Sequence, residues 1–103
     1  MTVRLTHLAD LDLNEIWIYN AKRYGVEHAD KYQEFLTDEI EKLAAYPERG
    51  KVVTSHPYLR SILIQWRAGG HAHTAYYETS TDAIHIVRVL HTAMNAQDHL
   101  PRG

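Results

Sequence analysis

Residues 84–100 read IHIVRVLHTAMNAQDHL, and this stretch decides how the rest of the chain is arranged. Its first half is rich in β-branched and aliphatic residues, which favour a strand, and its second half is polar except for Met94 and Leu100. Strict alternation of side chains puts Arg88 on one face of this strand and His91 on the other. The face of Arg88 would also carry Ile84, Ile86 and Leu90, and that of His91 would carry Val87 and Val89. A strand apolar on both faces is predicted to be central, with helices on one side and a tail, a partner or a substrate on the other.

Two amphipathic helices are predicted before the sheet. The first has Asp10 as its expected N-cap and ends at Gly25, and its apolar stripe comprises Leu13, Ile16, Trp17, Asn20 and Tyr24. The second is expected over Glu27–Ala45, before Pro47 and Gly50, with a stripe of Ala29, Tyr32, Leu36, Ile40, Leu43 and Ala44. The short break between the helices indicates an antiparallel hairpin.

Strand patterns follow the helices. A short strand is expected at Val3–Thr6, residues 51–57 read as a loop, and three strands are predicted at Tyr58–Trp66, His71–Glu78 and Ile84–His91. Short connections, one of them Ala68-Gly69-Gly70, favour an antiparallel meander. The predicted fold is α+β, in the order β-α-α-β-β-β: an N-terminal strand, a two-helix hairpin packed on a small antiparallel sheet, and a short C-terminal tail. Residues 1–103 form a single domain in this prediction.

Composition narrows the function classes. The chain has 103 residues and no cysteine, which excludes a disulfide framework, a thiolate nucleophile and a cysteine-based zinc site. The N-terminal residues contain no long uncharged apolar run, so neither a signal peptide nor a membrane span is expected. These features favour a protein of the reducing cytoplasm.

The net charge of −2 conceals an asymmetry between the two halves of the chain. Residues 1–50 carry 6 basic and 10 acidic residues, whereas residues 51–103 carry 5 and 3. The predicted sheet is therefore the more basic half, which suits an anionic partner such as a nucleic acid or an acidic peptide. A simple balance of charge across a small domain explains the same asymmetry.

Histidines and arginines are the candidate chemical groups of the sheet. His71 and His73 share a strand face, yet a pair supplies only two of the three or four ligands that zinc takes, so neither a metal nor another cofactor is predicted. Arg60, Arg67 and Arg88, together with His91, could bind phosphates and act on RNA, or the arginines could pair with carboxylates of the helical half. The acidic net charge argues against a nuclease.

The chain resembles the RelE/ParE toxin superfamily, and most of all its ParE-type plasmid-stabilisation toxins. The N-terminal part of the resemblance is residues 8–32, LADLDLNEIWIYNAKRYGVEHADKY, and the middle part is Leu43–Ala44, Pro47, Gly50 and Pro57–Ser61. The most specific part is IVRVLH at residues 86–91, followed by Met94 and by His99–Leu100.

The resemblance implies the toxin component of a type II toxin–antitoxin system, neutralised by a cognate antitoxin that often has a DNA-binding N-terminal domain. Contact with operator DNA would run only through the antitoxin. ParE-type members are associated with inhibition of DNA gyrase, and RelE-type members cut messenger RNA on the ribosome. A third possibility is an antitoxin-binding module that has lost its toxicity.

Site residues follow from these alternatives. In the ParE interpretation the target-binding residues are His91, Met94, His99 and Leu100, all in or beside the tail. Antitoxin binding is assigned to Arg60, Trp66 and Arg67 on the basic half. In the ribonuclease alternative the catalytic residues would be Arg60, Arg88 and His91, but RelE-like nucleases often have a tyrosine near the C-terminus and no tyrosine follows His91. The sequence therefore favours a non-enzymatic inhibitor.

Overall fold

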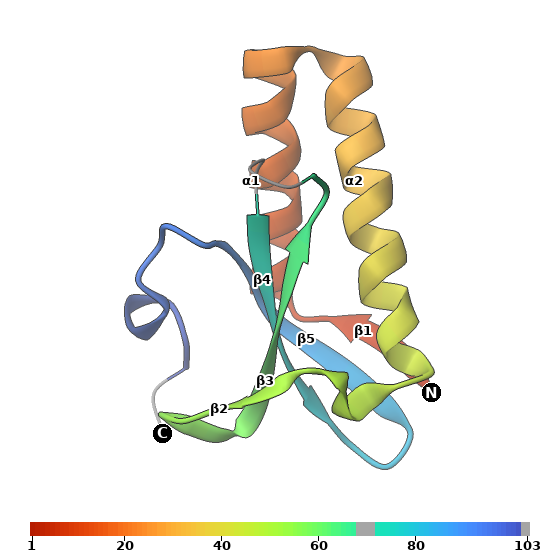
Figure 1. Cartoon of the computed structure of the whole chain (residues 1–103), viewed down its shortest axis with the longest axis vertical. Helices are drawn as coiled ribbons and strands as arrows, with labels where there is room; N and C mark the ends of the chain where they lie inside the picture. The colour runs from red at the N-terminus through yellow and green to blue at the C-terminus, as the bar shows by residue number, and fades with distance from the viewer. Residues whose placement is uncertain (68–71, 102–103) are drawn as a thin grey trace.

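A five-stranded sheet with a helical hairpin against it makes up the computed structural model, which describes residues 1–67 and 72–101 (Figure 1). The elements in chain order are β1 (Thr2–Leu5), α1 (His7–Tyr24), α2 (Val26–Glu41), β2 (Lys51–Val53), β3 (His56–Gln65), β4 (Ala72–Thr79) and β5 (Ala83–His91). Three 3₁₀ turns complete them: η1 (Lys42–Ala44), η2 (Pro47–Arg49) and η3 (Ala96–Asp98). This architecture confirms the predicted α+β fold.

The strands lie in the order β1-β5-β4-β3-β2, so β5 is an interior strand, as its two apolar faces predict. Strands β2 to β5 pair antiparallel, whereas β1 pairs parallel with β5. The sheet is therefore mixed. Strand β1 is short and ends at Leu5, and beyond Ile86 the outer edge of β5 is no longer covered by another strand.

Helix α1 begins earlier than predicted. Its N-cap is Thr6, not Asp10: the Thr6 hydroxyl accepts the N–H of Ala9 at 3.1 Å and donates to the carbonyl of Val87 at 2.8 Å. One side chain thus caps the helix and ties it to β5. The predicted stop at Gly25 is confirmed, because Gly25 adopts a φ of 96°, which favours glycine. Within the described residues, neither helix has the length and apolarity needed to cross a membrane.

Two predicted boundaries after the hairpin are wrong. Helix α2 ends at Glu41 and continues only as η1, and part of the predicted loop 51–57 forms strand β2 and the start of β3. Lys51 and Val52 pair with Ser61 and Arg60 of strand β3. This pairing makes the segment a strand, and the local sequence by itself does not indicate one. The predicted turn at residues 68–70 and the strand start at residue 71 lie outside the described residues.

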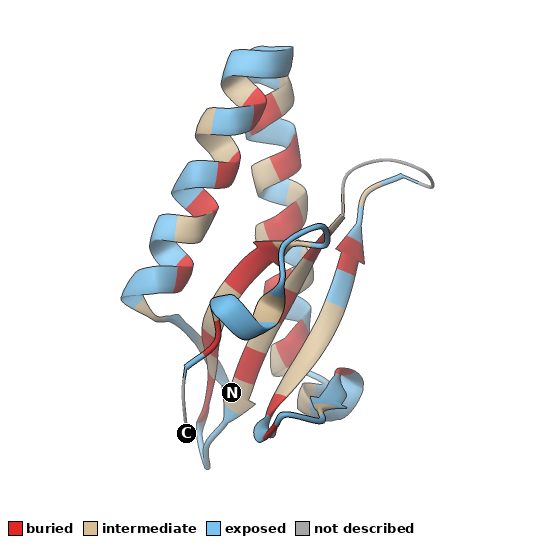
Figure 2. Ribbon diagram, turned by 90° about the vertical axis from the view of Figure 1, so that its left-hand side faces the viewer, coloured by how far each residue is buried: buried red, intermediate tan, exposed pale blue. Residues whose placement is uncertain are grey.

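The main core lies between the hairpin and one face of the sheet (Figure 2). Its buried side chains include Leu13, Ile16, Tyr32, Leu36, Ile40, Leu43, Ile64, Ala75, Tyr77, Ile84, Ile86 and Val89. The predicted helical stripes therefore supply the helical side of this core, except that Tyr24 is exposed. Tyr77 also holds the η2 turn that follows the hairpin, because its hydroxyl donates to the Pro47 carbonyl and accepts the Gly50 N–H.

A β-bulge in β5 corrects the predicted faces of this strand. Tyr76 pairs with Arg88 but Tyr77 pairs with Ile86, so Val87 is an extra residue. Alternation restarts after it. The face toward the helices carries Ile84, Ile86, Val89 and His91, and the opposite face carries His85, Arg88 and Leu90. Arg88 is therefore separated from Ile84 and Ile86, with which strict alternation grouped it.

Candidate functional site

The C-terminal tail is held against the sheet by Arg88. The Arg88 Nε and Nη2 atoms donate to the two carboxylate oxygens of Asp12 at 2.7 and 2.8 Å, and Nη1 donates to the His99 carbonyl at 2.9 Å. The Asp12 carboxylate also accepts the Val89 N–H at 2.9 Å, at the edge of β5 that β1 leaves uncovered. Arg88 thus joins α1, β5 and the tail.

This ion pair is largely shielded from solvent, since the side chains of Arg88 and Asp12 are each 14% exposed. The hydrogen bond to Asp12 raises the pKa of Arg88, and its burial opposes that rise. A forked pair of this kind fixes orientation as well as distance, because two parallel N–H groups meet two oxygens. The sequence motif IVRVLH therefore contains a structural clamp.

A second anchor holds the end of the tail. The His56 Nε2 lies 2.6 Å from the Pro101 carbonyl, and since a carbonyl only accepts, Nε2 carries the hydrogen. On the other side of the ring, Nδ1 lies 2.8 Å from the Ser55 hydroxyl, which accepts the Gln97 amide N–H at 2.8 Å. These bonds connect the start of β3 to Gln97 within η3 and to Pro101 beyond it.

Apolar burial reinforces these polar anchors. Leu100 is buried, as are Leu59 and Leu90, and none of the three belongs to the core under the hairpin. Leu90 lies on the face of β5 that carries Arg88 and looks away from the helices. The tail is therefore the cover of this face of β5 around Arg88 and Leu90.

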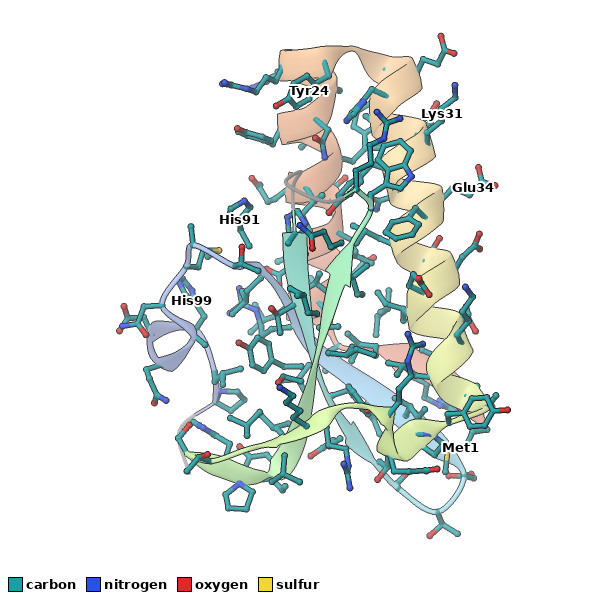
Figure 3. All side chains as sticks on the ribbon, viewed as in Figure 1. Met1, Tyr24, Lys31, Glu34, His91 and His99 are labelled. Carbon is teal, nitrogen blue, oxygen red and sulfur yellow. The ribbon has the colours of Figure 1, made fainter. Side chains whose placement is uncertain are left out.

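Beside the tail lies a cavity of about 510 Å³ between α1 and the ends of β4 and β5. Its lining residues are Asp12, Glu15, Ile16, Tyr19, Asn20, His73, Val89, Leu90, His91 and Met94. Figure 3 shows His91 where β5 passes into the tail, and the cavity that it lines with Ile16 and Asn20 places it on the α1 side of the sheet. The Ala93 N–H donates to His91 Nδ1 at 3.0 Å, so the hydrogen of the neutral ring is on Nε2.

The wall of the cavity continues into a buried tyrosine–histidine contact. His73 pairs with His91 across the two strands, and their rings meet edge to face at 5.3 Å. The Tyr32 hydroxyl of α2 lies 2.6 Å from His73 Nδ1. Burial raises the pKa of Tyr32 to about 12, so its phenol stays protonated at neutral pH.

Tyr32 makes a testable contribution to alkaline stability. Its pKa is about 12 in the folded chain against an ordinary value of 10.0, so between these values only the unfolded chain loses the proton. Stability should therefore decline as pH rises from 10 to 12. We expect Tyr32→Phe to flatten that decline by up to about 3 kcal/mol in urea denaturation, relative to Tyr58→Phe at an exposed position. Equal alkaline slopes for the two variants would contradict this assignment.

The three residues of the ribonuclease alternative lie apart. Arg60 Nη1 donates to the carbonyls of Glu48 and Gly50, at 3.2 and 2.7 Å, and so holds the η2 turn. Arg60 pairs with Tyr77 and His91 pairs with His73, which places them about 13 Å apart along the sheet. Arg88 lies on the other face.

The predicted target-binding residues divide into anchors and an exposed group. Leu100 is buried, and the His99 carbonyl is bound by Arg88. Met94 is 41% exposed at the mouth of the cavity, and His91 lines that cavity. The tail thus presents Met94 while its far end is fixed.

The predicted antitoxin-binding residues lie in two separate places. The Arg67 guanidinium stacks over the Trp66 ring at 4.9 Å, and Trp66 packs against His28, Tyr32 and Phe35 at the far end of β3. Arg60 lies six residues earlier in the chain, beside η2. Trp66 and Arg67 therefore form one aromatic–basic surface, of which Arg60 is not part.

Sequence reasoning missed two residues that organise the tail. Asp12 reads as an ordinary first-turn acid and His56 as part of a loop, and nothing in their local sequence indicates partners 76 and 45 residues away. Across the described ranges 1–67 and 72–101, no group of three or more metal-ligating side chains occurs. His73 meets His91 instead, while the expected partner at residue 71 lies outside those ranges.

Comparison with known proteins gives consistent matches over nearly the whole chain. Residues 3–96 match the family described as "ParE toxin of type II toxin-antitoxin system, parDE". Toxin ParE1 of Caulobacter vibrioides is 36% identical over 97 residues, covering 94% of this chain and 95% of that protein. Toxin ParE1 of Mycobacterium tuberculosis is 34% identical over 98 residues, covering 93% and 94%.

A solved structure shares the fold. The chain aligns with one from a structure titled "Chromosomal ParDE TA system from P. aeruginosa" with a TM-score of 0.75 and 20% sequence identity, covering 88% of this chain and 95% of that one. At this identity the match bears on the arrangement of helices and strands alone.

Proposed function

Because the chain belongs to the ParE toxin family of type II toxin–antitoxin systems, we propose that it binds DNA gyrase and inhibits it without cutting a nucleic acid. The single domain, residues 1–103, acts in the cytoplasm. A cognate antitoxin with a DNA-binding N-terminal domain neutralises it, and the toxin meets operator DNA only through that antitoxin.

One observation carries the proposal: the tail presents an exposed Met94 on an anchored segment. Arg88 and His56 bind backbone carbonyls of residues 99 and 101, so the segment after β5 is positioned before any partner arrives. A preorganised apolar side chain suits binding, because little ordering entropy remains to be lost. This supports a target-binding role for the tail.

The arginine contacts support an inhibitor over a ribonuclease. A nuclease needs its cationic groups and its acid or base around one scissile phosphate. Arg60 and Arg88 are engaged by the η2 turn and by Asp12, and His91 lies on the α1 side of the sheet.

The proposal is tested by inducing the toxin without an antitoxin and following DNA, RNA and protein synthesis separately. Gyrase inhibition predicts that DNA synthesis falls first while translation continues. An early fall in protein synthesis would instead indicate messenger RNA cleavage. Soluble protein accumulating with no fall in any of the three would indicate a module that lacks toxicity.

Antitoxin binding is proposed at the surface of Trp66 and Arg67, where an acidic segment would meet exposed basic charge. We expect Arg67→Glu to weaken the complex by about three- to tenfold at low salt and by less at high salt, because salt screens the electrostatic interaction between the two proteins. Isothermal titration at two salt concentrations measures this. Unchanged affinity at low salt would exclude Arg67 from the interface.

Arg60→Glu is a less direct probe of the same interface. It removes the guanidinium that binds the η2 turn, so a loss of affinity would include a change in the fold. Lys31→Glu on α2 is a better-matched control, since Lys31 is exposed and its ion-pair partner in the described part of the chain is Glu27, one turn away.

A further inference from the structure

The cavity beside the tail is rich in acceptors and poor in cations. Glu15 lines it, is exposed, and has no hydrogen-bond or ion-pair partner within the part of the chain that the structure describes. The other lining carboxylate, Asp12, is balanced by Arg88. Among residues 1–67 and 72–101, neither lysine nor arginine lines the cavity, so these residues leave one negative charge uncompensated there.

A buried amide in the same wall lacks a donor. Asn20 is 2% exposed, and its Nδ2 donates to the Ile16 carbonyl at 3.0 Å. That bond fixes the orientation of the amide, because the reverse orientation would place two oxygens together. Its Oδ1 has no hydrogen-bond partner among the described residues. A buried acceptor of this kind requires a donor, and buried polar groups in proteins seldom lack one.

The remaining walls suit an aliphatic stem. Ile16, Val89, Leu90 and Met94 line the cavity around these acceptors. Lysine and arginine pack their methylene groups on apolar surface while the charged head stays among acceptors. A neutral apolar group would fill the same walls but would leave both Glu15 and Asn20 Oδ1 without partners.

We propose that this cavity binds one lysine or arginine side chain of a protein partner, with its stem against Met94 and Val89 and its charged head toward Glu15 and Asn20. The inference rests on the cavity, the uncompensated carboxylate and the unpartnered amide, and it holds whichever protein the toxin inhibits. Its location also links it to the tail, since Met94 is both part of the wall and the exposed group of that segment.

The test is an NMR titration of the ¹⁵N-labelled full chain with n-butylguanidinium, using n-butylurea as its uncharged analogue of the same shape. We expect saturable shift changes at amides around Asn20 and His91 with n-butylguanidinium and much smaller ones with n-butylurea. Equal shifts from both probes would overturn the cationic assignment, and changes spread along all acidic helix surfaces would overturn the site.

Matched variants make the test specific. Glu15→Gln should weaken n-butylguanidinium binding by about two- to fivefold, as expected for an exposed ion pair. Glu34→Gln is the control: Glu34 is exposed on α2, away from His91 in Figure 3, and should leave binding unchanged. Equal effects of the two substitutions would contradict the proposal.

Asn20→Leu supplies an independent readout. It should abolish the preference for n-butylguanidinium over n-butylurea and raise the melting temperature of the free chain, because an unpartnered acceptor is removed. A lower melting temperature would show that Asn20 Oδ1 is already satisfied. Glu15 is exposed, so its variant keeps the proposal testable even if Asn20→Leu fails to fold.

Discussion

Replacing Arg88 by methionine is expected to lower the free energy of unfolding by about 3 kcal/mol and to release the tail. Methionine keeps an apolar stem but removes both hydrogen bonds to Asp12 and the one to the His99 carbonyl. Asp12 would then be a shielded carboxylate that keeps the Val89 N–H as its one partner among the described residues, and losing one member of a buried ion pair typically costs about 3–5 kcal/mol. We take the low end because each side chain retains 14% exposure.

Urea denaturation measures the loss, and hydrogen exchange at residues 94–101 reports release of the tail. Arg67→Met is the control, since Arg67 is exposed and, among the described residues, its guanidinium stacks on Trp66 alone; it should change stability by less than about 0.5 kcal/mol. In a double-mutant cycle with Asp12→Asn the two substitutions should be strongly non-additive. A loss below about 1 kcal/mol with a protected tail would show that Arg88 is no clamp.

Replacing Met94 by glutamate is expected to abolish growth arrest without changing stability. Met94 is 41% exposed, so a polar side chain is tolerated in the free protein. In the proposed complex with gyrase the same change would bury a charge in an apolar contact, weakening binding by at least about thirtyfold, or about 2 kcal/mol. The inducer concentration needed for growth arrest measures the effect in cells, and gyrase supercoiling assays measure it directly.

Two substitutions separate this effect from general damage. Leu63→Glu changes another exposed apolar residue, 59% exposed in β3 and outside the lining of the cavity that Met94 helps to form, and should leave toxicity intact. Leu100→Ala should instead destabilise the chain by about 2–3 kcal/mol, because Leu100 is buried. If Met94→Glu stays fully toxic, the tail is not the target-binding segment.

The helices and strands were predictable because their signals are local. The stripe from Leu13 to Asn20 and that from Ala29 to Leu43 repeat at the helical period, and both reach the core. Strand β5 was recognisable from its β-branched residues, and Gly25 from its position between two amphipathic segments. Each of these patterns depends on residues within one or two turns of one another.

The bulge, the cap and strand β2 were not predictable in the same way. Val87 becomes an extra residue because β4 pairs with β5 in two registers, and register is a property of two strands together. Thr6 is preferred to Asp10 as the N-cap because it also reaches the Val87 carbonyl, 81 residues away. Strand β2 is ordered by its pairing with β3.

In the candidate site, too, some features were predictable from the sequence and others depend on contacts between distant residues. The sequence alone singled out the tail, Arg88 and His91, and it identified the family resemblance that the comparisons confirm. It did not assign Arg88 to a clamp with Asp12, nor join His73, His91 and Asn20 in one cavity wall.

Periodicity and composition thus determined the fold class, the hairpin and the strand that organises the sheet, because hydrophobic burial acts on patterns that are visible along the chain. The tertiary structure alone decided which polar groups are engaged in structural contacts and which remain to bind a partner. The reason is physical: a hydrogen bond or an ion pair forms between groups a few ångströms apart, and the bulge at Val87 sets which side chains of β5 meet α1 and which meet the tail.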